Sequence, residues 1–123
     1  IGILTREESF KTAFAPEPVC DNFAVKGGGD FALSSKSFIK TSEDLIFAMS
    51  SAPSVVGREK ELKLPIGVLF GEDDEILDAK LHGEKFSELT DAELKILPNK
   101  GHMLPLTEPE ECAEFIHGIM KKI

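Results

Sequence analysis

The sequence predicts an α/β protein in which a parallel strand–helix–strand–helix unit over residues 61–123 follows a mostly helical segment over residues 1–60. The second half contains one short, continuous apolar run at residues 64–70, which is typical of a strand buried on both faces, and a second short strand at residues 93–98. A stretch of helix length follows each. The first half is rich in phenylalanine and turn residues and lacks the alternation of a long strand. We therefore expect residues 1–60 to cover a core formed by residues 61–123.

The first half is expected to contain two short helices, at about residues 5–12 and 35–50. In the second of these, Ser42 is a candidate N-cap for a helix whose apolar face carries Leu45, Ile46 and Met49. An Ala-Pro-Glu-Pro stretch between the helices favours extended backbone, and a triple glycine favours an irregular turn. The segment is therefore predicted to be a small helical layer joined by loops.

The second half has the more regular pattern. Residues 64–70 predict the first strand, with Pro65 at its first residue, where the absent N–H removes no needed ladder bond. A helix is expected at 78–89 and a second strand at 93–98. A crossover of this length joins parallel strands and winds in the right-handed sense.

The last predicted helix has the strongest start signal in the chain. Thr107 and Glu110 have the spacing of a capping box, and Pro109 falls in the first turn, where its absent N–H costs nothing. Apolar residues then recur every three or four positions and predict one buried face: Cys112, Phe115, Ile116, Ile119 and Ile123.

Composition and charge narrow the classes of partner. The chain has 123 residues and a net charge of −8, with 22 acidic against 14 basic residues. This balance argues against binding to nucleic acid or to anionic membrane surfaces. No apolar run approaches the ~18 residues that a membrane span requires. Small molecules or a protein partner remain.

The two cysteines, Cys20 and Cys112, lie far apart and have no CxxC spacing, so we expect free thiols and a cytoplasmic location. Together with His82 and His117 they form no metal-ligand spacing, and we expect neither a metal ion nor a cofactor. The chain opens at Ile1 without a visible signal peptide, and we expect it to be a piece of something longer.

An acid and a base follow the two predicted strands at equal distances. Asp74 stands four residues after Phe70, and His102 stands four residues after Pro98. Because the carboxyl ends of neighbouring parallel strands meet at one edge of a sheet, the two side chains are expected to lie close together. A carboxylate beside an imidazole makes the histidine a usable general base. The alternative is that both are loop residues on a solvated edge.

Residues 62–123 resemble the C-terminal part of an α/β-hydrolase. The resemblance rests on the apolar strand followed by the G-x-x-D-x-[I/V] pattern of Gly71–Ile76, and on the G-H segment of Gly101–Glu110 that leads through E-P-E into the last helix. It implies a partial α/β-hydrolase fold in which Asp74 is the triad acid and His102 the triad base. Asp73 is the alternative acid. Residues 1–60 occupy the place of the family's cap or lid.

The family's nucleophile elbow, G-x-S-x-G, does not occur in this sequence. The resemblance therefore implies a chain that supplies base and acid but no nucleophile, and that is close to inactive alone. Ile76 and Met103, next to the acid and the base, are the candidate walls of a substrate pocket.

Two functions remain open at this stage. In the first, the chain is the lid and C-terminal catalytic segment of a serine-type, esterase-like or lipase-like hydrolase that acts on a small apolar ester or amide, and its partner is the family's N-terminal half. Dehalogenation and carbon–carbon bond hydrolysis use the same acid and base. In the second, the chain is a non-catalytic binding or assembly module that self-associates, because two strands alone make a poor sheet.

Overall fold

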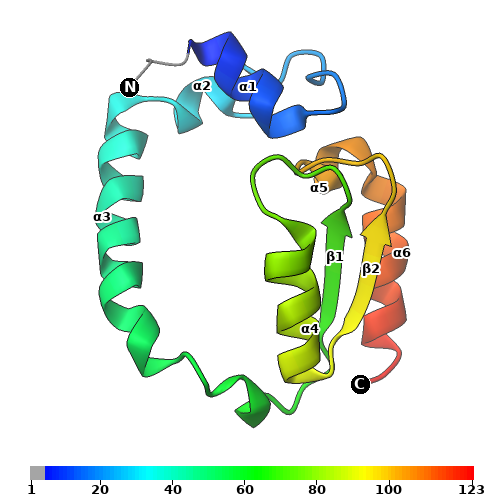
Figure 1. The fold of residues 1–123 in the computed structure, drawn as a ribbon. Coiled ribbons are helices and arrows are strands. Elements are labelled where there is room, and N and C mark those ends of the chain that lie inside the picture. Colours follow the sequence, from blue (N-terminus) through cyan, green and yellow to red (C-terminus); the bar gives the residue numbers. More distant parts are fainter. Residues whose placement is uncertain (1–4) are drawn as a thin grey trace. The chain divides into compact units, whose positions relative to one another are not determined.

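A two-stranded parallel sheet organises the C-terminal half of the computed structural model, which describes residues 5–123. Strand β1 (Gly67–Gly71) pairs with β2 (Glu93–Leu97), with Phe70 opposite Ile96. Figure 1 shows the two strands side by side with their carboxyl ends at the same edge. The parallel pairing confirms the predicted mixed α/β class. Pro65 lies before β1, not at its first residue as predicted, because the ladder begins only at Gly67.

The crossover between the strands is helical, as predicted. A π-helical segment, η3 (Ala79–Glu84), continues directly into α4 (Lys85–Thr90). The Asp78 side chain caps this start by accepting a hydrogen bond of 2.7 Å from the N–H of Leu81. The crossover carries the chain from the carboxyl end of β1 back to the end of the sheet at which β1 began. β2 therefore runs in the same direction as β1.

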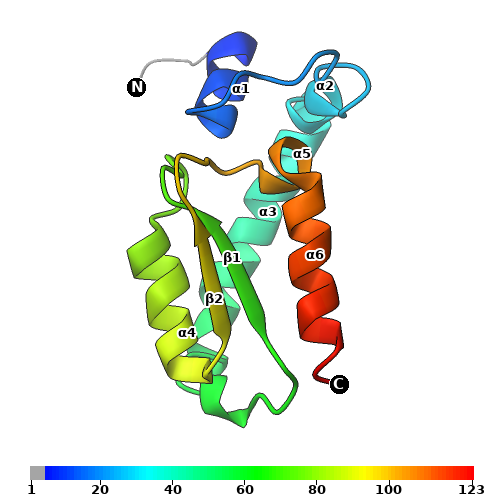
Figure 2. The same cartoon turned by 90° about the vertical axis from the view of Figure 1, so that its right-hand side faces the viewer.

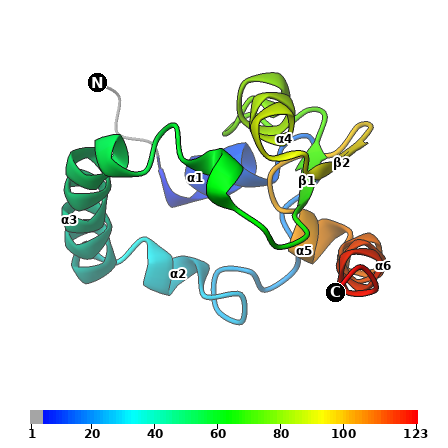
Figure 3. The same ribbon diagram turned by 90° about the horizontal axis from the view of Figure 1, so that it is seen from below.

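The other face of the sheet is covered by α6 (Pro109–Met120), which follows a single helical turn, α5 (Leu104–Thr107). Figures 2 and 3 show α4 and α6 on opposite sides of the two strands. Pro109 lies in the first turn of α6, as predicted. The predicted capping box is wrong, because Thr107 ends α5 and its hydroxyl donates to the Met103 carbonyl oxygen at 3.3 Å.

Helix α1 (Arg6–Phe14) belongs to the same compact unit as the sheet. Its start is a capping box formed by Thr5 and Glu8, and Phe14 at its end has no exposed surface. The unit comprises residues 5–20 and 62–123 of the described chain. The division therefore differs from the predicted boundary at residue 60, since residues 5–20 contact the loop after β2 and group with the core segment.

The second compact unit comprises residues 21–61. It contains α2 (Gly29–Ala32), α3 (Ser35–Ser51) and two short 3₁₀ turns, η1 (Ala52–Ser54) and η2 (Glu59–Glu61). Its helical character agrees with the prediction for this part of the chain.

The N-cap predicted for the long helix of this second unit is wrong. Helix α3 begins at Ser35, as predicted, but its cap is Ser34, whose hydroxyl oxygen accepts a hydrogen bond from the N–H of Ser37 at 3.2 Å. Ser42 lies inside the helix, where its hydroxyl donates to the Phe38 carbonyl oxygen.

Between residues 5 and 123, none of the helices combines the length and the apolar character that crossing a membrane would require.

Candidate functional site

The loops after β1 and β2 are joined backbone to backbone. The N–H of Glu72 donates to the Leu97 carbonyl oxygen, and the N–H of Asp73 donates to the Lys100 carbonyl oxygen, both at 2.9 Å. This approach requires glycine at position 71, because a Cβ there would overlap the carbonyl oxygens of Lys100 and Gly101. The contact between the loops therefore sets where their side chains lie relative to one another.

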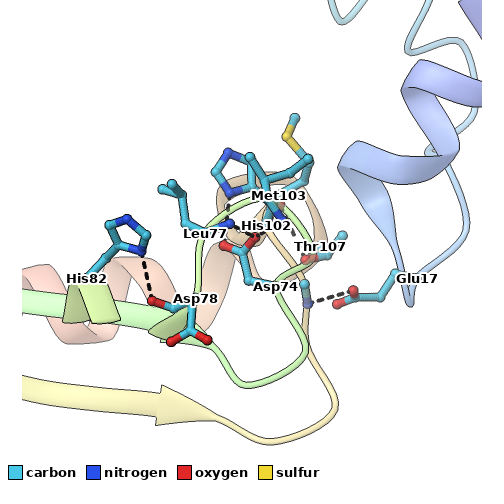
Figure 4. A network of polar contacts seen from close by, with 10 residues as sticks. Glu17, Asp74, Leu77, Asp78, His82, His102, Met103 and Thr107 are labelled. Carbon is cyan, nitrogen blue, oxygen red and sulfur yellow. Dashed lines mark hydrogen bonds and ion pairs between the residues drawn. The ribbon is translucent and has the colours of Figure 1, made fainter. Parts of the chain in front are cut away.

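Asp74 and His102 are brought together at this edge of the sheet. The Nδ1 atom of His102 lies 2.9 Å from Oδ2 of Asp74, and Figure 4 shows the two side chains facing one another. The Asp74 side chain is only 4% exposed, whereas that of His102 is 34% exposed. Asp74 lies three residues past the end of β1 and His102 five residues past the end of β2, so the spacing is not equal as predicted. The two side chains are nevertheless in direct contact, with the acid buried and the base reachable from solvent.

Three donors surround the Asp74 carboxylate. Besides the contact with His102, Oδ1 accepts hydrogen bonds from the N–H groups of Ile76, at 2.8 Å, and Leu77, at 2.9 Å. Burial opposes the ionisation of Asp74, but the hydrogen bonds from Leu77, His102 and Ile76 outweigh it, so the pKa of Asp74 lies below its ordinary value. Asp74 is therefore a carboxylate at neutral pH.

The ionised carboxylate determines the tautomer of His102. A carboxylate only accepts hydrogen bonds, so Nδ1 of a neutral His102 carries the proton and donates it toward Asp74. The lone pair of a neutral imidazole is then on Nε2, the atom directed away from the carboxylate. This is the arrangement that a histidine needs to remove a proton from a hydroxyl group.

Asp73, the alternative acid, does not contact His102 in this arrangement. Its side chain is exposed, and its backbone N–H is the group that joins the two loops. The structure therefore pairs His102 with the second of the two adjacent aspartates.

A hollow of about 310 Å³ opens beside His102, between β1 and α6. The other residues that line it are mostly apolar: Gly67, Leu69, Leu104, Pro105, Cys112, Phe115 and Ile116. Ile76 and Met103 are not among them. Ile76 contributes its N–H to the Asp74 carboxylate, and Met103 precedes α5, with its carbonyl oxygen accepting from the N–H of Leu106. Their role as pocket walls stays a prediction.

Cys112 lines this hollow but lacks the properties of a nucleophile. Burial, with the nearby carboxylates of Glu108 and Glu111, raises the pKa of its thiol. The thiolate, which is the reactive form, is therefore scarce at neutral pH. Both Cys112 and Cys20 are free cysteines.

The other two histidines, His82 and His117, have no described contact with Asp74 or His102. Nδ1 of His82 is 3.0 Å from the Asp78 carbonyl oxygen within the crossover, and His117 is in the last turn of α6. Within residues 5–123 the structure groups no three histidine, cysteine or acidic side chains that could hold a metal ion.

Sequence reasoning missed one residue near the site, Glu17. Its Oε2 atom accepts a hydrogen bond of 2.9 Å from the N–H of Gly101, the residue before His102. No local pattern signals this contact, because the two residues are 84 positions apart and only folding brings them together.

No family model, curated protein or solved structure matches the chain in the comparisons with known proteins.

Proposed function

We propose that this chain is the C-terminal segment of an α/β-hydrolase and supplies the general base, His102, and its acid partner, Asp74. The observation that carries the proposal is the contact of 2.9 Å between Nδ1 of His102 and the buried carboxylate of Asp74. It is joined by the sequence resemblance over residues 62–123. The proposed substrate is a small, fairly apolar ester or amide.

In the proposed reaction, Nε2 of His102 takes the proton of a serine hydroxyl as the serine oxygen attacks the substrate carbonyl carbon. Asp74 stays ionised and stabilises the imidazolium that forms. The imidazolium then gives its proton to the leaving alcohol or amine as the carbon–oxygen or carbon–nitrogen bond breaks. Water, activated by the same histidine, hydrolyses the acyl-enzyme and regenerates the serine.

The serine must come from outside this sequence, since the sequence contains no nucleophile elbow. The proposed partner is a segment that carries the elbow and the oxyanion-hole donors, as the N-terminal half of the family does. Without them the base–acid pair lacks both the covalent step and most of the electrostatic stabilisation, so we expect little activity from this chain alone. The free cysteines support a cytoplasmic location for this function.

Native mass spectrometry of the purified chain, followed by labelling with a fluorophosphonate probe, tests the proposal. We expect a second polypeptide to accompany the chain and to be labelled on a serine. His102→Ala should slow labelling by roughly a thousandfold or more, because the base that activates the serine is lost. The matched control is His82→Ala, which removes an exposed histidine from the crossover and should leave labelling unchanged. Equal labelling of the wild-type and His102→Ala proteins would contradict the proposal.

The second candidate function is a non-catalytic assembly module, and one observation favours it. Among the described residues β1 pairs only with β2, and a second apolar hollow of about 180 Å³ lies beside β1 and α6. An unpaired strand edge next to apolar surface is a site for association. If native mass spectrometry finds only multiples of the chain itself and the probe labels nothing, this second function is the better one.

A further inference from the structure

The backbone of the loop that carries His102 is held from the side of the N-terminal segment by a glutamate. Oε2 of Glu17 accepts the N–H of Gly101 at 2.9 Å. Figure 4 shows the Glu17 side chain reaching this loop from a different part of the chain than Asp74 does. Asp74 therefore contacts the imidazole of His102 directly, whereas Glu17 acts on the peptide group that immediately precedes it.

The Glu17 carboxylate lies in an enclosed position. Its side chain is 14% exposed, and its Oε1 atom is buried without a hydrogen-bond donor among the residues that the structure describes. Leaving a carboxylate oxygen in this state costs free energy, so the surrounding contacts must hold the side chain in place.

Lys100, the residue before Gly101, also lies near the Glu17 carboxylate. Its Nζ atom lies 3.9 Å from Oε1 of Glu17 and also pairs with the carboxylate of Glu108, the residue before α6. The hydrogen bond with Glu108, together with the nearby charge of Glu17, raises the pKa of Lys100, which therefore stays charged. Lys100, in the same loop as His102, thus lies between the charges of Glu17 and Glu108.

The backbone is also closely packed at this point. A Cβ on Gly101 would overlap the carbonyl oxygen of Ala15, so the N-terminal segment and the His102 loop meet at van der Waals distance. Phe14, fully buried at the end of α1, anchors the segment next to this contact. Loss of this acceptor would leave the N–H of Gly101, a buried residue, without its hydrogen-bond partner, and this costs free energy.

We propose that Glu17 is a positioning residue for His102: by accepting the N–H of Gly101 it holds the loop at the height where Nδ1 of His102 meets Asp74. The proposal rests on the proposed function in one respect, which is that His102 is the base. The hydrogen bond of Glu17 goes to the backbone of Gly101, whereas the imidazole bonds to Asp74. The effect of Glu17 is on the geometry of the Asp74–His102 contact, and that geometry is measurable without a nucleophile or a substrate.

The experiment measures the exchange of the His102 Nδ1 proton with solvent by NMR in the purified chain, with His102→Ala used to assign its resonance. We expect the slowest exchange in the wild-type protein. Glu17→Gln keeps an acceptor of the same shape but without charge, and its exchange should be faster by a few-fold. Glu17→Ala removes the acceptor and Glu17→Asp withdraws it by one methylene, and both should accelerate exchange by roughly tenfold.

Glu88→Ala is the matched control, because Glu88 is an exposed glutamate on α4. It should leave the exchange rate unchanged. Circular dichroism identifies the variants that are folded, and the comparison uses only those. If Glu17 merely stabilised the fold, its replacement would lower the melting temperature without changing the Nδ1 exchange of the folded protein.

Equal exchange rates in the wild-type protein and a folded Glu17→Ala or Glu17→Asp variant would overturn the proposal. Where neither of these folds, Glu17→Gln, the isosteric variant, decides: a rate equal to that of the wild type overturns it. The result is independent of the probe labelling described above. Labelling that fails in every variant contradicts the hydrolase function, while the order of exchange rates still tests the role of Glu17.

Discussion

Asp74 has three hydrogen-bond donors around a carboxylate that is almost fully buried, and this arrangement makes it the most strongly specified side chain of the site. The two backbone donors, from Ile76 and Leu77, are local and form as the loop turns. The third donor, His102, comes from the neighbouring loop. The preceding residue, Asp73, has an exposed side chain. Of the two adjacent aspartates, only Asp74 is therefore buried against His102.

Acid should weaken the fold through Asp74. Because hydrogen bonds hold its pKa below the ordinary value despite burial, its stabilising contribution is present above the pKa of the unfolded chain and is lost as pH falls through the folded-state pKa. We expect the free energy of unfolding, measured with urea, to fall from pH 5 toward pH 3. Asp74→Asn should remove part of this decrease. Asp73→Asn is the control, and an equal effect of both variants would contradict the assignment.

At the scale of elements, the two strands matter for the site mainly because of where they end. The register of β1 and β2 places Gly71 opposite Leu97, and the two loops leave the sheet at the same height. Helices α4 and α6 cover opposite faces of the sheet, as Figure 2 shows, and leave this edge free for the loops. The Asp74–His102 contact therefore depends on the close approach of two backbones as much as on the two side chains.

Gly71→Ala should separate the loops. The added methyl group would overlap two carbonyl oxygens, so we expect a loss of about 1–3 kcal/mol in the free energy of unfolding, as for overpacked sites. Gly118→Ala in α6 is the matched control, because a Cβ there meets nothing within 4 Å. It should raise the free energy of unfolding by about 0.5–1 kcal/mol, since alanine is the better helix former. Urea unfolding of both variants checks the opposite signs, and equal signs would contradict this account.

At the scale of the whole molecule, the described core is small. Its buried apolar side chains are Phe14, Leu97 and Leu104, all within the unit of residues 5–20 and 62–123. Ile116, which lines both hollows beside β1, is 57% exposed. A unit that leaves this much apolar surface beside a strand with one unpaired edge gains free energy by covering that surface. Both candidate functions provide a partner for this surface, either a second segment or a second copy.

Ile116→Lys should weaken that association. Placing a charge in the hollow removes the gain from burying an isoleucine, and we expect the dissociation constant to rise by roughly tenfold or more. Sedimentation velocity over a range of concentrations measures the effect. Leu81→Lys is the control, since Leu81 is similarly exposed, at 60%, but lies on η3 on the other face of the sheet. The surface is misassigned if Leu81→Lys weakens association and Ile116→Lys does not.

The sequence by itself determined the parts of this protein that depend on local pattern. Apolar runs and helical periodicity placed both strands, the crossover helix and the last helix, because each of these patterns repeats within a few residues. Asp74 and His102 each follow a predicted strand within a few residues, and this was enough to expect them to lie close together, since neighbouring parallel strands end on the same side of a sheet. The exact offsets, three residues after β1 and five after β2, were not predicted.

Only the tertiary structure decided the features that depend on contacts between distant residues. Residues 5–20 join the core unit in this way. The choice of Asp74 over Asp73 and the hydrogen bond from Gly101 to Glu17 belong to the same class. The two wrong caps are different, because the bonds from Ser37 to Ser34 and from Thr107 to Met103 are local ones that compete with the predicted caps. In each case several partners satisfy the local pattern equally well, and the backbone groups that folding brings within hydrogen-bond distance select one of them.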